Sequence, residues 1–591
     1  MSEREDLPSA IEVALGAHLH DIGKFMQRAI GEIAALPEQV RNRMSDVLPS
    51  FQGRHTHYHA LFSDAFFDEC VDPNPLPAPL DKRWIRDCAV YHHKPLQDGV
   101  AVPGGSITWL VAEADRIAAG MERKKRDEDQ ESSHDPKRRD DYRRTRLIAT
   151  PTTIWRENDQ KAWRFYPVAE LRPGRLFDLA EDRRAEAVVG DYQALWGAFK
   201  AAYAELANFT QGSAEAYVEG LIALTERFCW SIPSSTIDDP DVSLHDHGRV
   251  AAAVAACLRT HHAEAGDLKD EAAVRDRDRP KFRLLTGDLS GIQASLFRLK
   301  SEGVKGLARL LRGRSFRMQL IGEAAARRAC AAFGLTAFNV IQMAGGRFLI
   351  LVPEATAGEA ERIVQDLRGE IDAWTVDEYV GDLVLNLALT GPVSARDLIE
   401  DLPKVHAQMG AAAEAAKLLP LATQALGVVD LPFDRDLAIC ESCGVRPATA
   451  RDATDERARC LACEAETRLG RRLTKADAVA FGDKTHDADR IFGLDVAILR
   501  ETDAAPAALG FRKRGVGMAK GKPAADRFFE AYTPRHGAES LADPRLIRAR
   551  AGNRRTKKNP GRATSSPSPN WPPIPAARWT AGRSAGRCWP F

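Results

Sequence analysis

Two pairs of cysteines constrain the fold of this chain more than any other sequence feature. They are Cys440-Glu-Ser-Cys443 and Cys460-Leu-Ala-Cys463, with sixteen residues between the pairs. Pairs at this spacing can supply four thiolates in the tetrahedral geometry that zinc prefers. Because all four ligands would come from the protein, the pattern predicts a closed, structural zinc site rather than a catalytic one. Four unrelated buried cysteines and a redox pair are the weaker alternatives.

Length and charge set broad limits on the rest of the chain. A chain of 591 residues is too long for one core and predicts roughly three or four structural units. Lys plus Arg and Asp plus Glu both number 83, so any binding to nucleic acid must come from local patches. No apolar run reaches the ~18–20 residues of a membrane span, and the N-terminus lacks the features of a signal peptide. We therefore expect a cytoplasmic protein with no membrane partner.

Hydrophobic patterning divides the chain before the cysteine pairs. Residues 1–121 show the helical period, whereas residues 150–430 mix helices and strands. The stretch between them interleaves both charges with almost nothing apolar, which predicts a solvated linker. The mixed region predicts an α+β sandwich of the ferredoxin type. Its main expected elements are a strand over 282–293 that enters a glycine-rich loop, a long helix over 303–333 and a buried strand over 348–352.

The adjacent residues His20 and Asp21 are the strongest candidate for a catalytic centre. Imidazole and carboxylate together can hold one or two metal ions, and this donor set suits Mn, Fe, Ni, Co or Zn. Two such ions can clamp a phosphodiester, and Lys24, one turn after His20, can offset phosphate charge. Further ligands must come from elsewhere, and we interpret His18, His55 and His57 as ordinary core or surface residues. The remaining candidates are His59, His92, His93 and Asp115.

A short glycine-containing segment, Thr286-Gly-Asp-Leu-Ser-Gly-Ile-Gln293, is a weaker candidate for nucleotide binding. Small residues after a strand let backbone N–H groups approach a phosphate, and an acid there can contact a metal or a ribose. A turn requirement explains such glycines equally often. The candidate residues are Gly287, Asp288, Ser290, Gly291 and Gln293.

The C-terminal stretch differs in kind from the rest of the chain. From Arg545 onward there is no Asp or Glu, whereas Arg, Lys, Pro and three Trp residues are frequent. Three interpretations compete: a basic tail that binds nucleic acid, a plain disordered tail and an out-of-frame translation. Disordered tails rarely carry three tryptophans, so we favour the out-of-frame translation.

Several segments in order resemble the large subunit of type III-A CRISPR effector complexes, the Csm type with HD and palm domains. The resemblance runs from about residue 10 to about residue 535. The N-terminal segments that carry it are HDIGKF at 20–25, HHKP at 92–95 and EADRIAAGMER at 113–123. The later ones are WSIPSST at 230–236, DVSLHDHGRVAAAVAACL at 241–258, GDLSGIQ at 287–293, LARLLRGRSFRMQLI at 307–321 and AGGRFLILVP at 344–353. The cysteine pairs lie where the family has its zinc element.

The resemblance implies an HD domain that cuts single-stranded DNA with divalent Mn, Ni or Co. His20, Asp21, His92 and Asp115 match the HD ligand positions, with His59 and His93 as further choices and Lys24 beside them. It also implies two palm domains that together convert ATP to cyclic oligoadenylates. The partners implied are other subunits of the complex, guide RNA and target RNA.

The family's catalytic palm carries a Gly-Gly-Asp-Asp hairpin that does not occur in this sequence. The first palm has Gly345-Gly346-Arg347-Phe348 at the equivalent turn, and Arg and Phe cannot replace two metal-binding carboxylates. We therefore expect half of a site for ATP and no cyclase activity, because the chain stops before a second palm.

These observations predict a multidomain α+β protein. The expected units are an all-α HD domain (1–121), a charged linker (122–150), a ferredoxin-like, non-catalytic palm (151–430), a helical domain with four zinc-binding cysteines (431–500), the start of a connection to a missing second palm (501–544) and a disordered basic tail (545–591). The expected function is a metal-dependent single-stranded DNA nuclease in antiviral defence. A catalytically silent scaffold fragment and an HD nucleotide phosphohydrolase are the alternatives.

Overall fold

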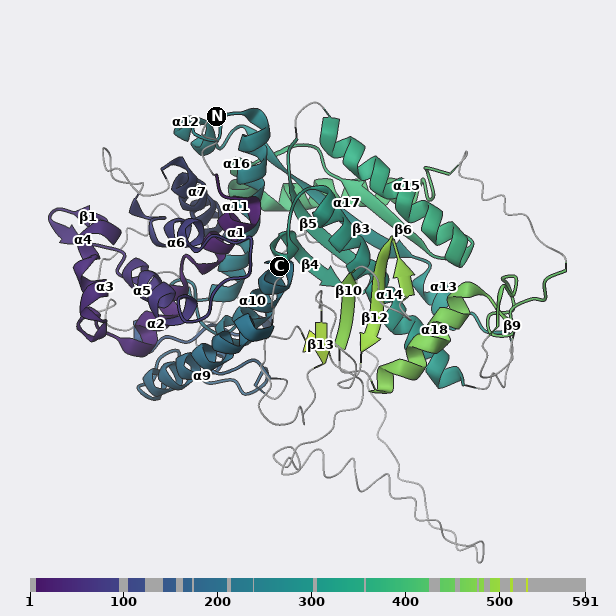
Figure 1. Cartoon of the computed structure of the whole chain (residues 1–591), viewed down its shortest axis with the longest axis horizontal. Helices are drawn as coiled ribbons and strands as arrows, with labels where there is room; N and C mark the ends of the chain where they lie inside the picture. The colour runs from purple at the N-terminus through teal and green to yellow at the C-terminus, as the bar shows by residue number, and fades with distance from the viewer. Residues whose placement is uncertain are drawn as a thin grey trace, which may run out of the picture.

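The computed structural model has a helical part at one end and sheets at the other (Figure 1). The predictions for most of the charged linker, most of residues 501–544 and the whole C-terminal tail lie outside the described residues. The described residues are 7–94, 105–122, 142–155, 163–172, 175–209, 214–236, 239–300, 306–355, 358–424, 436–451, 458–475, 478–482, 489–499, 511–513 and 528–529.

The N-terminal part is helical, as the hydrophobic period predicted. Its first helix, α1 (Ala10–Leu19), begins at Ser9, whose hydroxyl accepts the Glu12 backbone N–H while the Glu12 carboxylate accepts the Ser9 N–H. The other helices are α2 (Ile22–Ile30), α3 (Glu38–Asn42), α4 (Met44–Val47), α5 (His59–Phe66), which continues into the π-helical turn Phe67–Val71, α6 (Lys82–Val90) and α7 (Ser106–Glu122). A 3-10 turn (Ile33–Ala35) and the short pair β1 (Ser50–Phe51) and β2 (Arg54–His55) complete this part.

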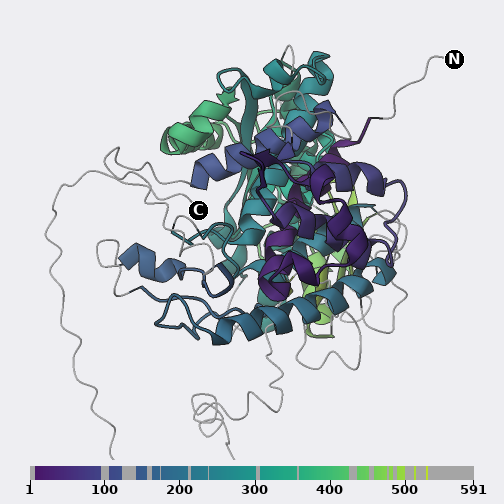
Figure 2. The same cartoon turned by 90° about the vertical axis from the view of Figure 1, so that its left-hand side faces the viewer.

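Later helices pack onto this N-terminal part. Helix α11 (Leu244–Ala265) lies against α1 and α7, and α9 (Ala187–Phe209) lies against α2. Figure 2, in which the helical part faces the viewer, shows the purple N-terminal helices in front of the teal ones. The remaining helices of this region are α8 (Thr150–Trp155), α10 (Ala214–Cys229) and α12 (Glu271–Arg275).

A four-stranded antiparallel sheet follows, in the order β4-β5-β3-β6 with the short β7 (Val393–Ser394) paired to β3. Two helices lie between β3 and β4 and one between β5 and β6, which is the strand-helix-strand-strand-helix-strand order of the ferredoxin-like motif. Residues along β3 are buried without alternation, so helices cover both faces of the sheet. The elements are β3 (Pro280–Ser290), α13 (Ile292–Phe297), α14 (Leu307–Ala332), the 3-10 turn Ala337–Asn339, β4 (Val340–Ala344), β5 (Arg347–Pro353), α15 (Glu359–Tyr379) and β6 (Val384–Leu389).

A two-residue turn joins β4 to β5. Ala344 pairs with Arg347, and the residues between them, Gly345 and Gly346, have φ values of 61° and 84°. Two consecutive positive φ values define the tight hairpin turn that matches strand twist, and glycine adopts them without steric cost. The sequence predicted this turn and the buried strand after it correctly.

The C-terminal described part contains strands that the sequence did not predict. Residues 431–500 were expected to be helical, but besides α18 they hold the short pair β8 and β9 and three strands of a five-stranded sheet ordered β11-β12-β10-β13-β14. The elements are α16 (Ala395–Glu400), α17 (Leu402–Lys417), β8 (Ala450–Arg451), β9 (Ala458–Arg459), α18 (Leu461–Arg472), the 3-10 turn Leu473–Lys475, β10 (Ala478–Gly482), β11 (Asp489–Ile491), β12 (Leu494–Leu499), β13 (Phe511–Lys513) and β14 (Phe528–Phe529).

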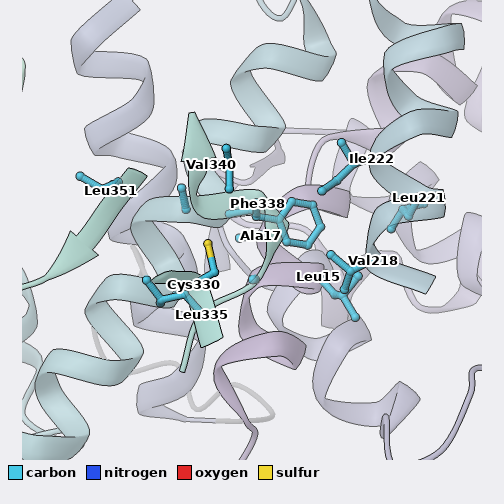
Figure 3. Packing of buried hydrophobic residues seen from close by; sticks show 14 of the residues in the cluster. Leu15, Ala17, Val218, Leu221, Ile222, Cys330, Leu335, Phe338, Val340 and Leu351 are labelled. Carbon is cyan, nitrogen blue, oxygen red and sulfur yellow. The ribbon is translucent and has the colours of Figure 1, made fainter. Parts of the chain in front are cut away.

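One continuous core joins the helical part to the sheets. Figure 3 shows a part of this core in which Phe338, just before β4, packs among Leu15 and Ala17 of α1 and Leu221 of α10. Segments more than 300 residues apart in sequence therefore share one apolar interior. Among the residues that the structure describes, no helix is long and apolar enough to cross a membrane.

We expect Phe338→Ala to destabilise the helical part and the sheet together. Phe338 is 0% exposed, and removing a fully buried aromatic ring costs about 3–5 kcal/mol. Chemical unfolding followed by circular dichroism measures the change. Phe177→Ala, at a position that is 83% exposed, is the control and should shift the unfolding free energy by less than about 0.5 kcal/mol. Equal stability of Phe338→Ala and the wild type would contradict the shared core.

Candidate metal centre

His20 and Asp21 lie at the break between α1 and α2. Both side chains are buried. Gly23, two residues later, allows the close approach of α5, because a Cβ atom there would lie 2.0 Å from the His59 backbone oxygen. Ser63 of α5 fixes the contact by donating to the His20 carbonyl at 2.7 Å and accepting from the Gly23 N–H at 3.0 Å. This packing brings His59 beside Asp21.

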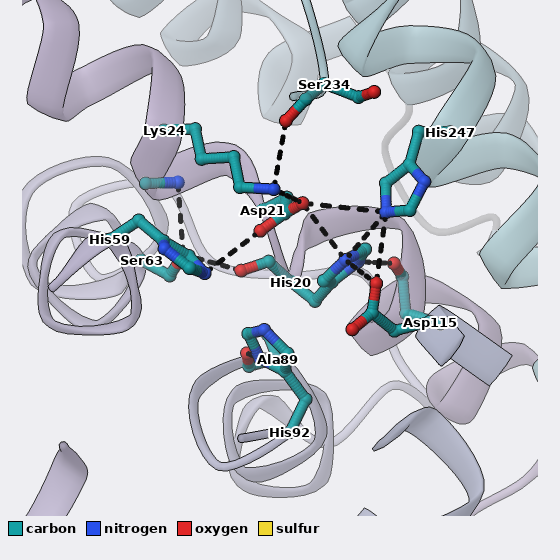
Figure 4. A network of polar contacts seen from close by, with 12 residues as sticks. His20, Asp21, Lys24, His59, Ser63, Ala89, His92, Asp115, Ser234 and His247 are labelled. Carbon is teal, nitrogen blue, oxygen red and sulfur yellow. Dashed lines mark hydrogen bonds and ion pairs between the residues drawn. The ribbon is translucent and has the colours of Figure 1, made fainter. Parts of the chain in front are cut away.

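A first group of donors consists of His20, Asp115 and His247 (Figure 4). Asp115 Oδ1 lies 3.4 Å from His20 Nε2 and 3.2 Å from His247 Nε2, and the two Nε2 atoms are 3.3 Å apart. The three side chains come from the end of α1, from α7 and from the first turn of α11. Residues separated by more than 200 positions in sequence thus converge on one point.

A second group consists of His59, His92 and His93. His59 Nε2 lies 3.0 Å from His93 Nε2, and the His92 and His93 rings are 3.9 Å apart at their centroids. Asp21 lies between the two groups, with Oδ1 3.2 Å from His59 Nε2 and Oδ2 3.3 Å from His20 Nε2. His20, Asp21 and His92 are also close enough together to share an ion. A carboxylate in the position of Asp21 can therefore bridge two ions.

Hydrogen bonds at Nδ1 to backbone carbonyls orient two of these imidazoles. His20 Nδ1 donates to the Ala17 carbonyl at 2.6 Å, and His92 Nδ1 donates to the Ala89 carbonyl at 2.7 Å. A carbonyl only accepts, so Nδ1 carries the hydrogen and Nε2 faces the centre. His92 Nε2 is buried and has no hydrogen-bond partner among the described residues. A buried nitrogen without a partner, beside imidazole and carboxylate donors, fits a divalent transition metal.

The charges of the two groups differ. Burial alone would lower the pKa of His20, but Asp21 and Asp115 outweigh burial and raise it to about 9. Burial is likewise outweighed at His247, where Glu122 and Asp115 raise the pKa to about 10.

The second group is neutral by contrast, because burial lowers the pKa values of His59, His92 and His93. Burial also opposes ionisation of Asp21 and Asp115, but the neighbouring cations hold the pKa values of both carboxyls well below their usual range.

Lys24 lies beside the centre and is held in place. Its Nζ atom donates to Asp21 Oδ2 at 2.5 Å and to the Ser234 carbonyl at 3.0 Å, and its side chain is 26% exposed. The predicted role of Lys24 toward phosphate stays a prediction, but its position at the rim is compatible with it.

Three other histidines lie outside both groups. His18 is buried in the core, with Nε2 2.8 Å from the Thr225 hydroxyl. The His57 ring is tilted against that of His93 at a centroid distance of 4.0 Å, and His55 belongs to β2. None of the three belongs to a metal-binding group among the described residues.

The sequence interpretation missed two residues of the centre, His247 and Glu122. His247 lies in the segment 241–258, which resembles the family's palm region, and Glu122 stands at the start of the expected charged linker. The two residues are 125 positions apart, and no spacing rule connects residues so distant. The one available signal was a second cluster of histidine and aspartate, His245-Asp-His247, in a helical segment.

The four predicted zinc ligands converge in the structure. The sulfur atoms of all four cysteines lie within 4.8 Å of one another, and the side chains are buried. Two buried arginines face the sulfurs: Arg314 Nη2 is 3.3 Å from Cys463 Sγ, and Arg446 Nη1 is 3.5 Å from Cys460 Sγ. No disulfide links the described cysteines. Four thiolates with cationic neighbours fit a structural zinc ion.

The predicted nucleotide-binding segment lies at the end of β3 and the start of α13. Gly287 lies within β3 and Gln293 within α13. Between them, Gly291 has a φ of 87°, and Ser290 Oγ accepts from Asn386 at 2.9 Å. The positive φ of Gly291 therefore accounts for a glycine at this turn without a bound nucleotide.

Asp288, the acid of this segment, is already paired. It forms ion pairs with Arg347 at 2.6 Å and with Lys417 at 2.9 Å. The structure thus shows an acid neutralised by two cations, and binding of a nucleotide stays a prediction.

Comparison with known proteins relates the chain to CRISPR subunits. Residues 281–430 match the family model of Csm1 subunit domain B. The chain is 26% identical over 415 residues to the "CRISPR system single-strand-specific deoxyribonuclease Cas10/Csm1 (subtype III-A)" of Mycobacterium tuberculosis, covering 66% of this chain and 46% of that protein. It is 27% identical over 391 residues to the protein of the same description from Thermococcus onnurineus, covering 65% and 43%. The chain therefore spans about half the length of the curated relatives it matches.

Solved structures show the same fold. A Csm1-Csm4 cassette in complex with one ATP has a TM-score of 0.54 at 19% identity, covering 88% of this chain and 59% of that chain. A Csm1-Csm4 subcomplex of the type III-A interference complex has a TM-score of 0.52 at 20% identity, with the same coverage.

We expect one zinc ion per chain at the four cysteines, and we expect Cys443→Ser to lose it. A hydroxyl is a poor substitute for a thiolate, and loss of a structural ion removes folding free energy. Elemental analysis measures the zinc content, and thermal unfolding measures the stability. Cys70→Ser, at another buried cysteine, is the control and should keep its zinc. A zinc-free wild type that is folded would contradict the assignment.

Proposed function

We propose that this chain is a subunit of a type III-A CRISPR complex and hydrolyses single-stranded DNA. The reason is its homology to the Cas10/Csm1 large subunits of such systems. The observation that carries the nuclease assignment is the convergence of two donor groups around Asp21, one of which leaves His92 Nε2 buried without a partner among the described residues. The relatives are described as single-strand-specific deoxyribonucleases, which agrees with this chemistry.

Two divalent ions, of Mn, Ni or Co, fit the centre. We assign His20, Asp115 and His247 to one ion, His59, His92 and His93 to the other, and Asp21 to both. When bound, such ions activate a water molecule and stabilise the leaving oxygen of a phosphodiester.

The residues of the chain prepare the centre for this reaction. Backbone carbonyls hold His20 and His92 with Nε2 toward the centre, so little reorganisation is needed on binding. Lys24, a cation at the rim, holds Asp21 in place and offsets the charge of an incoming phosphate. The contacts of Lys24 with Asp21 and with the Ser234 carbonyl hold its Nζ atom beside the centre.

The four-stranded sheet is proposed to be the non-catalytic palm. Its hairpin turn carries Arg347 where catalysis of nucleotidyl transfer requires carboxylates, and Arg347 neutralises Asp288. This sheet therefore provides half of an ATP site and no catalytic metal site.

We propose an HD domain at residues 1–121, a palm at 151–430 and a zinc element at 431–500. Within the range 151–430, however, α9 and α11 pack against the N-terminal helices, and His247 of α11 belongs to the metal centre. The proposed partners are the other subunits of the complex, guide RNA, target RNA and single-stranded DNA, and the proposed location is the cytoplasm.

We expect the purified chain to cleave labelled single-stranded DNA with manganese or nickel. The double variant His20→Ala/Asp21→Ala should reduce cleavage by about 100-fold or more, because it removes two of the residues that would hold the ions. Gel electrophoresis of the products measures the rate. His55→Ala, outside both donor groups, should cleave as the wild type does. A folded, metal-loaded wild type without cleavage would favour the scaffold alternative.

We expect no cyclic oligoadenylate when the chain alone is incubated with ATP and magnesium or manganese. The Arg347–Asp288 pair leaves the hairpin without a pair of free carboxylates for the ions. Chromatography with mass detection measures the products. Cyclic products that persist after removal of contaminating proteins would contradict the assignment of this sheet as non-catalytic.

A further inference from the structure

Glu122, the last residue of α7, connects the metal centre with the segment that leads into α11. Its Oε1 atom lies 2.7 Å from His247 Nδ1, and its Oε2 atom accepts from the Ser234 hydroxyl at 3.3 Å. The Ser234 carbonyl in turn accepts from Lys24, which also binds Asp21 (Figure 4). These contacts link Asp21 Oδ2 to His247 Nδ1 through Lys24, Ser234 and Glu122.

The chemistry of the Glu122 contact determines which nitrogen of His247 faces the centre. An ionised carboxylate accepts hydrogen bonds and cannot donate them, so His247 Nδ1 carries a hydrogen. The Nε2 atom then faces Asp115 at 3.2 Å and His20 Nε2 at 3.3 Å. Carbonyl groups orient His20 and His92 in the same way, but His247 alone among these three faces a carboxylate at Nδ1.

We propose that Glu122 is a positioning residue that makes His247 a metal ligand. This inference rests on the proposed metal-dependent function and adds a residue that does not itself touch the ions. A carboxylate at Nδ1 fixes the tautomer and ring orientation of a ligating histidine and increases its basicity. Ser234 holds the second carboxylate oxygen and so fixes the direction of Glu122.

A purely structural role for Glu122 would have a different signature. Glu113, on the same helix, provides the comparison, because its carboxylate forms a 2.5 Å contact with Arg277 and belongs to neither donor group. Loss of charge at either residue can lower stability, but only loss at Glu122 should change metal binding.

The experiment compares Glu122→Gln with Glu113→Gln in the full chain. Electron paramagnetic resonance of free Mn²⁺ gives the affinity and the number of bound ions, and the absorption spectrum of the Co²⁺-loaded protein reports on the ligands. We expect Glu122→Gln to weaken binding at one position by about 10–100-fold and to alter the Co²⁺ spectrum. Glu113→Gln should keep both properties of the wild type even if it melts at a lower temperature. Wild-type affinity and spectrum in folded Glu122→Gln would overturn the proposal.

A second variant keeps the proposal testable if Glu122→Gln fails to fold. Ser234→Ala removes the hydroxyl that holds Glu122 and leaves the carboxylate in place, so we expect a smaller loss of affinity at the same position. Unchanged Mn²⁺ binding in this variant would count against the proposal. A wild type that binds no Mn²⁺ would instead refute the proposed function itself. If His20→Ala/Asp21→Ala abolishes Mn²⁺ binding but Glu122→Gln preserves it, only the proposed role of Glu122 is refuted.

Discussion

The packing of α11 between the helical part and the four-stranded sheet is the contact on which the core and the metal centre both depend. Residues 251–258 of α11 are all buried, and most are alanines, whose small side chains allow close approach on several sides. The same helix is tied to the sheet, because Asn339 donates to the Ala253 carbonyl at 3.2 Å and His261 Nδ1 lies 2.7 Å from the Glu354 carbonyl. The position of His247 at its start is therefore set by the fold of the sheet as well as by its neighbours.

Buried carboxylates explain the unusual charges of the centre. An ionised Asp21 or Asp115 without a compensating cation would cost several kcal/mol in a buried site. Lys24 and protonated His20 and His247 supply that compensation. Asp21 and Asp115 raise the pKa of His20 to about 9, and Glu122 and Asp115 raise that of His247 to about 10, in both cases despite burial. A divalent ion carries the same compensating charge and displaces these protons when it binds. The buried carboxylates thus require a compensating positive charge, which either protons or metal ions can provide.

The sequence predicted those features that depend on local spacing. Cys440 and Cys443 are close because they are three positions apart, and the Gly345-Gly346 turn follows from two residues that both accept positive φ. His247 could not be found in this way, because its approach to His20 depends on the packing of α11 against α1. The strands β10–β12 were missed for a related reason: their pairing is between segments, and the apolar letters there do not distinguish a strand from a helix.

Two acidic sites of the chain show how neighbouring cations decide what an acid can do. Asp288 forms ion pairs with Arg347 and Lys417, so its charge is neutralised within the protein. Asp21 also binds Lys24, but its other partners, like those of Asp115, are imidazoles, which can exchange a proton for a metal ion. The charge of an acid paired with arginine is already neutralised, whereas an acid surrounded by histidines can bind a metal ion. The distribution of arginine and histidine, rather than that of the acids, therefore separates the metal centre from the sheet's hairpin.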